Sequence, residues 1–437
     1  MRTKLPYHKF RLSNGLTVLL HPMNSVRSVF AVLYVKVGAI YEKENERGIS
    51  HFVEHAAFLG TKKYPSPLAI SLSKENLGAR LDGETNRFST QYWTRLPWVN
   101  VAKSIELLRQ IIFEPILDEK AILEEKNIVL SEFNDFWHNP DRRFSYEFWR
   151  RRFKQKDHPY GWRAIGVPET IETFNKKQVV KWRERYYCPA NMILSVAGDL
   201  EKEKIRKLVE SNFATEKGGV KASEPMFDPD GYSDFTLYHQ EEDRPQIKFE
   251  ISFPAFGWRQ ASRRKRAALG LLNHVFGGGA ASRLFQRLRE KEKFVYSVGS
   301  DVNLHHSWLG NLGILGSVPI EKLVLSMRAM KEEIDLLVKN GVSEKELGVA
   351  KNFAAASSLM SFDSPENIAY YLGSQEFDGE EIWLPDKYNE EGMKITKNEI
   401  DDLTREIFNY QKMNIGLLGK IPPETLEGIK STFQPYG

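Results

Sequence analysis

The chain has 437 residues, of which 41% are apolar and 27% are charged, and its net charge is +4. This length exceeds a single hydrophobic core and predicts two or three domains, while the composition excludes a disordered or membrane-embedded chain. The basic clusters alternate with acidic ones, which argues against nucleic-acid binding. The single cysteine, Cys188, excludes an intramolecular disulfide and a multi-cysteine metal site, and we expect it to be a small buried filler.

The first half of the chain predicts strands followed by helices. Residues 11–39 are typical of a hairpin and a further strand, with Asn14-Gly15 as the turn and residues 29–37 rich in β-branched and aromatic side chains. Helical periodicity begins near Gly48. It continues over residues 66–78, 98–112 and 118–137, and the half closes with the short apolar strand 191–200.

The second half repeats this order of elements from Asp234 onward. A strand-like run at 244–257 precedes a helical run at 263–279, and the segment "MNIGLLGKI" echoes "NMILSVAGDL" of the first half. The segment between the halves is rich in Gly, Pro, Ser and charge, which is typical of an exposed connection. We therefore predict an α+β fold of two similar domains. Their bounds are 1–219 and 234–437, joined by a linker at 220–233.

The basic cluster at residues 259–266 does not indicate a ligand, and the apolar runs do not indicate a membrane segment. The basic cluster at residues 259–266 is expected to be a solvated first helical turn rather than a phosphate-facing patch. No run approaches 18 apolar residues and the N-terminus has no apolar targeting core, so we expect a cytoplasmic protein with no membrane partner.

The stretch "GISHFVEHAAFLGT" places two imidazoles and a carboxylate in an otherwise apolar segment. On a helix, His51 and His55 lie on one face a turn apart, so both can direct a ring nitrogen at one metal ion. Glu54 then lies beside the metal, where it can take a proton from water. The order His-x-x-Glu-His is the inverse of the commoner His-Glu-x-x-His. The alternative is an accidental spacing on a helix surface.

Such a pair of histidines needs a third protein ligand, typically a carboxylate. Glu125 and Glu132 are seven residues apart, or two helical turns, and face the same way. They are interspersed with the apolar residues Ile122, Ile128 and Val129. Spacing alone does not distinguish a metal ligand from a solvated or ion-paired carboxylate.

The chain resembles the pitrilysin, insulinase and mitochondrial-processing-peptidase superfamily of inverted-motif zinc proteases. The resemblance rests on "HFVEHAAFLGT" followed by Glu132 seventy-seven positions after His55, and on three further segments in the family's order. These are "HPYGWRAIGVPETIETF", "YYCPANMILSVAGDL" and "GGGAASRLFQRLREKEKFVYSVGS". The length is similar to that of the family's short subunit, which carries two repeats.

The resemblance implies one Zn²⁺ per chain, held by His51, His55 and Glu132, with Glu54 as general base. It implies that Glu125 assists the site from behind the ligands.

It also implies a substrate-binding role for Arg289 and Tyr296, which would hold the backbone carbonyl of the substrate. The segment "GARLDGETNRFSTQYW" matches the strand on which the substrate lies, although Asp82-Gly83 stands where the family usually has Asn-Ala.

The implied function is that of a zinc metalloendopeptidase. Its mostly antiparallel sheets, flanked by helices, would face each other across a cavity and enclose a peptide or unfolded segment as an extended strand. We expect a homodimer, or a heterodimer with a motif-less homologue, and a peptide substrate rather than nucleic acid. The alternative is a non-catalytic scaffold or partner subunit of the same fold. A nucleotide site at "FGGGAAS" is disfavoured because no Gly-Lys-Ser/Thr follows it.

Overall fold

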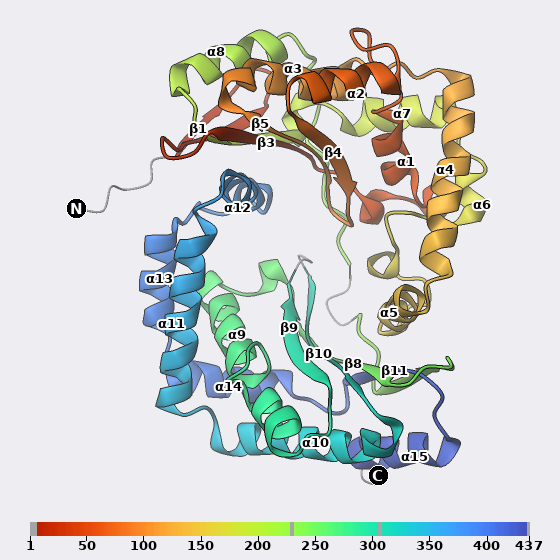
Figure 1. Cartoon of the computed structure of the whole chain (residues 1–437), viewed down its shortest axis with the longest axis vertical. Helices are drawn as coiled ribbons and strands as arrows, with labels where there is room; N and C mark the ends of the chain where they lie inside the picture. Colours follow the sequence, from red (N-terminus) through yellow and green to blue (C-terminus); the bar gives the residue numbers. More distant parts are fainter. Residues whose placement is uncertain (1–6, 228–230, 305–307, 435–437) are drawn as a thin grey trace. The chain divides into compact units, whose positions relative to one another are not determined.

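A computed structural model describes residues 7–227, 231–304 and 308–434. These residues form two units, each with its own sheet and its own apolar core (Figure 1). The first unit runs to residue 136 and adds residues 162–225 and 359–384. The second unit consists of residues 137–161, 226–358 and 385–437.

The first unit is built on a six-stranded sheet with the order β1-β2-β6-β3-β5-β4. Its strands are β1 (His8–Arg11), β2 (Thr17–Pro22), β3 (Ser28–Val35), β4 (Arg80–Thr85), β5 (Thr90–Pro97) and β6 (Met192–Gly198). Its helices are α1 (Ile49–Ala56), α2 (Pro67–Asn76), α3 (Val101–Phe113), α4 (Glu119–Trp137), α6 (Pro168–Ile171), α7 (Lys176–Tyr186), α8 (Lys202–Phe213) and α12 (Pro365–Phe377).

The second unit is built on a five-stranded sheet with the order β7-β11-β8-β10-β9. Its strands are β7 (Thr236–Gln240), β8 (Ile247–Phe256), β9 (Ser297–Asn303), β10 (Leu309–Val318) and β11 (Asn414–Leu418). Its helices are α5 (Pro140–Arg151), α9 (Arg263–Phe276), the π-helical η7 (Phe285–Lys291), α10 (Leu323–Asn340), α11 (Glu344–Ser361), α13 (Pro385–Met393), α14 (Lys397–Ile407) and α15 (Pro423–Phe433).

The two sheets share one topology, which confirms the predicted α+β fold with two similar halves. In the first sheet β6 is inserted between β2, to which it is parallel, and β3, to which it is antiparallel. In the second sheet β11 takes the same place between β7 and β8. All other strand pairs are antiparallel. The echo between "NMILSVAGDL" and "MNIGLLGKI" therefore marks equivalent strands.

The compact units are not continuous in sequence, unlike the predicted domains 1–219 and 234–437. Each sheet is covered by one helix from the other half of the sequence. Helix α12 packs against β2, β3 and β6 of the first sheet. There Ile368 and Leu372 join Phe30 in an apolar cluster. Helix α5 packs against β11 of the second sheet, where Phe144 stacks on Tyr238 at 5.9 Å between ring centroids.

The sequence predicted that the basic cluster at the start of α9 is solvated. In the structure, three of its cations are instead paired within the second unit. Arg264 pairs with Glu399 at 2.5 Å and Lys265 pairs with Glu406 at 2.7 Å, so both tie α9 to α14. Arg266 is buried and donates to the carbonyls of Trp258 and Ala261. Arg264, Lys265 and Arg266 therefore form ion pairs or hydrogen bonds within the second unit rather than a phosphate-facing patch.

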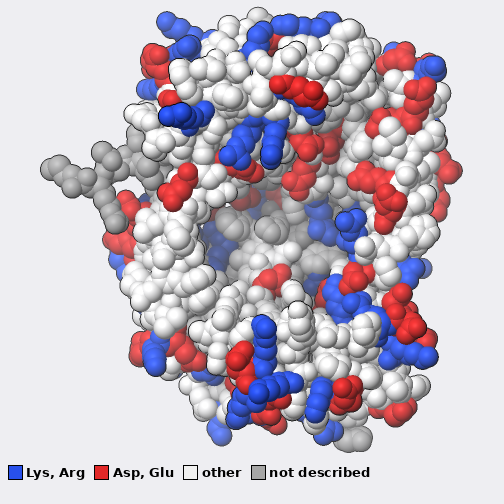
Figure 2. Space-filling view, in the orientation of Figure 1, with Lys and Arg blue, Asp and Glu red and all other residues white. Residues whose placement is uncertain are grey.

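The distribution of charge on the surface and the burial of Cys188 agree with the expectations from the sequence. Figure 2 shows Lys and Arg side chains intermixed with Asp and Glu over the displayed face. Cys188 is a buried free thiol, as predicted. In the part of the chain that the structure describes, no helix combines the length and apolar character that a membrane crossing needs.

One buried histidine gives the first unit a pH-dependent stability. Both ring nitrogens of His21 on β2 are buried without a hydrogen-bond partner, and desolvation lowers its pKa to about 4. The unfolded chain therefore binds this proton at higher pH than the folded chain. The contribution of His21 to the free energy of unfolding is fully present above pH 6.5. It falls by up to about 1.4 kcal/mol per pH unit towards pH 4.

We expect His21→Leu to remove this contribution. Urea unfolding at pH 7 and at pH 5 should then show a smaller loss of unfolding free energy in the variant than in the wild type. Equal losses would mean that His21 does not titrate over this range.

Candidate metal centre

Helix α1 carries the two histidines, and its start is fixed by a buried carboxylate. Glu42 accepts hydrogen bonds from the backbone N–H groups of Gly48, at 2.7 Å, and Ser50, at 2.9 Å. These amides belong to the first turn, where a helix leaves its N–H groups without internal partners. Gly48 has φ +94°, and a Cβ atom there would lie 2.8 Å from the Cα of Gly166. Only glycine fits this close approach.

Three side chains from two helices converge in the first unit, as the sequence predicted. The Nε2 atom of His55 lies 3.5 Å from Glu132 Oε2, and the Nε2 atom of His51 lies 3.7 Å from the same oxygen. One donor atom from each of these three residues lies within 4.8 Å of the other two. The two imidazole rings are 4.5 Å apart between centroids.

The two separations from Glu132 are close to those expected around one zinc ion. Two ligand atoms bound tetrahedrally at about 2.0–2.2 Å lie roughly 3.3–3.6 Å from each other. The donors are two imidazole nitrogens and one carboxylate oxygen, which is a common protein ligand set for zinc. His51, His55 and Glu132 could therefore hold the ion with little rearrangement.

Glu125 fixes the orientation of one imidazole. Its Oε1 lies 2.7 Å from Nδ1 of His55, and Glu125 itself is buried. This contact leaves Nε2 of His55 directed at Glu132, and a carboxylate behind a ligating histidine also raises the basicity of the ring. Glu125 thus lies where the resemblance implies, behind His55. The Nδ1 atom of His51 is buried without such a partner.

The charges of the cluster are unevenly distributed. Burial, and then the neighbouring His55, lower the pKa of His51 to about 4. Burial also opposes charge on His55, but the contacts with Glu125 and Glu132 outweigh it and raise its pKa to about 10. The contact with His55 lowers the pKa of Glu132. These shifts favour a neutral His51 and a cationic His55, so the positive charge that faces the carboxylates of Glu125 and Glu132 is carried by the His55 ring.

Glu54 lies on the buried side of α1, with only 7% of the residue exposed. Its Oε2 accepts a hydrogen bond of 2.7 Å from the hydroxyl of Thr85 on β4. Burial raises the pKa of Glu54 to about 7, although the Thr85 hydrogen bond opposes the shift. The carboxylate is thus held still and has a pKa close to neutrality.

The predicted substrate strand is the edge strand β4, and its residues alternate between two environments. Gly83 faces α1, and a Cβ atom there would lie 2.8 Å from Oε1 of Glu54. The replacement of the family's alanine by glycine therefore makes room for the carboxylate. Asp82 is exposed, and its side chain accepts a hydrogen bond from the Gly83 amide.

The remaining predicted residues are not members of this cluster in the first unit. Of the apolar residues interspersed with Glu125 and Glu132, Ile122 and Val129 are buried and Ile128 is 55% exposed. Arg289 lies in η7 and Tyr296 directly precedes β9, with 70% of Tyr296 exposed. Both belong to the second unit. Their role towards a substrate remains a prediction.

Sequence reasoning missed Glu42 and Thr85. Thr85 lies two residues after Gly83, and the alternation of a strand places both on the face that meets Glu54. That spacing could have identified it. Glu42 has no comparable signal, because it follows a short 3₁₀ helix, belongs to no periodic pattern and acts on backbone amides of α1 rather than on a side chain.

An inverted His-x-x-Glu-His helix on a mixed sheet, with a glutamate from a second helix, is the arrangement of a zinc-protease-like protein. The model "Insulinase (Peptidase family M16)" matches residues 17–156, and the model "Peptidase M16 inactive domain" matches residues 173–353. The chain belongs to this family, the M16 peptidases. The predicted resemblance is therefore confirmed.

Similar proteins extend over most of the chain. A protein of Rickettsia felis named "Uncharacterized zinc protease" is 33% identical over 82% of this chain and 84% of its own. A Bacillus subtilis protein, "Uncharacterized zinc protease YmxG", is 26% identical over 95% of this chain and 99% of its own.

Solved structures share the fold. A protease from Helicobacter pylori has a TM-score of 0.83 at 20% identity, covering 95% of this chain and 99% of its own. A peptidase M16 inactive domain from Pseudomonas fluorescens also has a TM-score of 0.83 at 20% identity, covering 96% of this chain and 98% of its own.

We predict that Glu42→Ala destabilises α1, because two buried amides lose their acceptor. The loss should be about 1–3 kcal/mol per unsatisfied donor. Urea unfolding measures it, and amide hydrogen exchange of residues 49–56 locates it. Glu44→Ala, at an exposed position in the same segment, is the matched control. Equal stability of the two variants would contradict the capping role of Glu42.

Proposed function

We propose that this chain is a zinc-dependent endopeptidase that cleaves peptides or unfolded segments bound in an extended conformation. The observation that carries the proposal is the convergence of His51, His55 and Glu132 at separations that suit one ion, with Glu54 held beside them. The naming of its relatives as zinc proteases supports the same class.

When bound, zinc polarises the scissile carbonyl and acidifies the attacking water. The residues of this chain supply the remaining functions. His51, His55 and Glu132 bind the ion, and Glu125 keeps Nε2 of His55 directed towards it. The proton moves through Glu54, which takes it from the attacking water and returns it to the leaving amine. Its pKa of about 7 suits both transfers near neutral pH.

The edge strand β4 supports the proposed mode of substrate binding. Because β4 ends the sheet, its outer edge presents backbone donors and acceptors to which an extended peptide can add as a further strand. Gly83 and Thr85 on β4 contact Glu54, so a peptide paired with β4 would run beside the proposed base. Backbone pairing reads little of the substrate's sequence, which suits a peptidase of broad preference.

We include Arg289 and Tyr296 in the proposal as donors to the substrate carbonyl. A guanidinium and a phenol can both stabilise the negative charge that this oxygen gains during attack. The enclosing chamber and the second chain, whether another copy or a motif-less homologue, remain predictions.

Replacing Glu54 tests the mechanism. Glu54→Gln should retain about one zinc per chain and lose peptide hydrolysis by at least about a hundredfold, because it removes only the base. His55→Ala should lose both. Glu124→Gln, on the exposed face of α4, is the control and should change neither. A folded wild-type chain that retains no zinc and cleaves no member of a diverse peptide library would contradict the proposal and favour a scaffold.

Replacing the second-unit pair tests the carbonyl contact separately. Arg289→Ala and Tyr296→Phe should each keep the zinc and lower kcat by about 10²–10³, with a smaller change in KM. Lys291→Ala, an exposed cation in the same π-helical segment, should behave as wild type. An unchanged kcat in both variants would remove Arg289 and Tyr296 from the mechanism and leave the metal site intact.

A further inference from the structure

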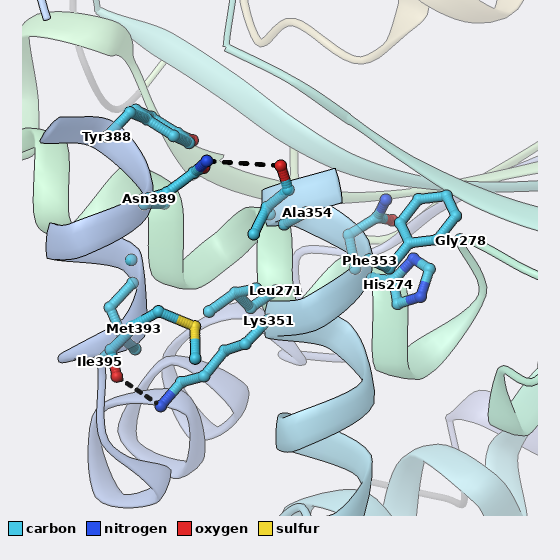
Figure 3. Close-up of a pocket in the computed structure, with 15 residues that line it drawn as sticks. Leu271, His274, Gly278, Lys351, Phe353, Ala354, Tyr388, Asn389, Met393 and Ile395 are labelled. Carbon is cyan, nitrogen blue, oxygen red and sulfur yellow. Dashed lines mark hydrogen bonds between the residues drawn. The ribbon is translucent and has the colours of Figure 1, made fainter. Parts of the chain in front are cut away.

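The second unit contains a cavity of about 290 Å³ between helices α9, α11 and α13 (Figure 3). Its walls are largely apolar: they include Leu271, Ala354, Met393 and Ile395, together with the rings of Phe353 and Tyr388. The amides of Asn273 and Asn389 also line it. It lies within one unit, and none of the residues assigned to the peptidase mechanism lines it. The volume is at the low end of the range of small-molecule sites.

Two helical glycines keep this cavity open. Gly270 is in the middle of α9 and Gly392 is in the last turn of α13, and both line the cavity. A Cβ atom at either position would meet no other atom within 4 Å. Packing therefore does not require glycine here, although glycine weakens a helix relative to alanine. Because Gly270 and Gly392 have no side chains, the space beside them in the cavity stays open.

The polar groups of the cavity favour an anion. The fifteen described residues that line it include Lys351 but no aspartate or glutamate. Lys351 extends along the cavity and donates one hydrogen bond, of 2.9 Å, to the carbonyl of Met393. An ammonium group has three N–H donors, so two remain for a ligand.

The opposite end of the cavity is uncharged at neutral pH. The ring of His274 stacks on Phe353 at 4.3 Å between centroids, and burial lowers the pKa of His274. The only formal charge lining the cavity at neutral pH is therefore the ammonium of Lys351, which is separated from the stacked rings by aliphatic side chains (Figure 3).

We propose that this cavity binds a small aliphatic carboxylate, with its chain against Leu271 and Ala354 and its carboxylate at Lys351. The volume corresponds to roughly ten atoms the size of a water oxygen, at about 30 Å³ each, which is the size of octanoate. A monoanion complements the single ammonium, and the thioether of Met393 can adapt to an aliphatic chain. This site is additional to the peptidase site and does not depend on it.

Calorimetric titration of the full-length chain with octanoate, octanol and octylammonium tests the proposal. The wild type should bind one octanoate saturably, and at least tenfold more tightly than octylammonium. Gly270→Leu should weaken octanoate binding at least tenfold, because its side chain occupies the cavity. Gly428→Leu is the matched control, at a partly exposed helical glycine of α15 outside the cavity, where a Cβ atom would make only an ordinary contact of 3.9 Å with Val324, and it should bind as wild type.

Lys351→Met tests the contact with the anion. It should lose the preference for octanoate over octanol while octanol binding persists, and circular dichroism checks that each variant is folded. Absence of saturable octanoate binding to the wild type would overturn the proposal. Binding that Gly270→Leu does not weaken, or a preference for octanoate that survives Lys351→Met, would also overturn it.

Discussion

Polar groups in a protein interior are unfavourable unless they meet partners, and helix α1 carries three ionisable side chains at buried or partly buried positions within five residues. The structure around α1 supplies partners for Glu54 and His55 from separate parts of the chain, whereas Nδ1 of His51 has none. Thr85 on the edge strand holds Glu54, and Glu125 on α4 holds His55. The loop before α1 supplies Glu42 to the first helical turn. These contacts tie α4, β4 and the loop before α1 to one helix.

The two units show how little of a site is specified by the fold. Each sheet inserts its last strand between its first two major strands, and in each a helix follows the second of them. In the first unit that helix is α1, with its two histidines and a glutamate. In the second unit it is α9, whose only histidine, His274, stacks on Phe353 instead of meeting a carboxylate. The scaffold is repeated, but among the residues that the structure describes such a group of donors occurs in the first unit alone.

The success of prediction from sequence varied with the range of the interaction. The Asn14-Gly15 turn and the shared helix face of His51 and His55 follow from local spacing, whereas the edge strand and the approach of Glu132 were implied only by the family resemblance, and the structure has all of them. Glu42 acts through backbone amides and leaves no side-chain pattern.

The covering helices α5 and α12 were also beyond sequence reasoning, because an amphipathic helix does not specify which of two apolar sheets it covers. Because each helix covers the sheet of the other half of the sequence, the order of synthesis matters. When the first 225 residues have left the ribosome, one apolar face of the first sheet, with Phe30 and Val32, still lacks its cover, since α12 is translated about 140 residues later. The nascent first unit must therefore wait, with that face exposed, until most of the second has been made.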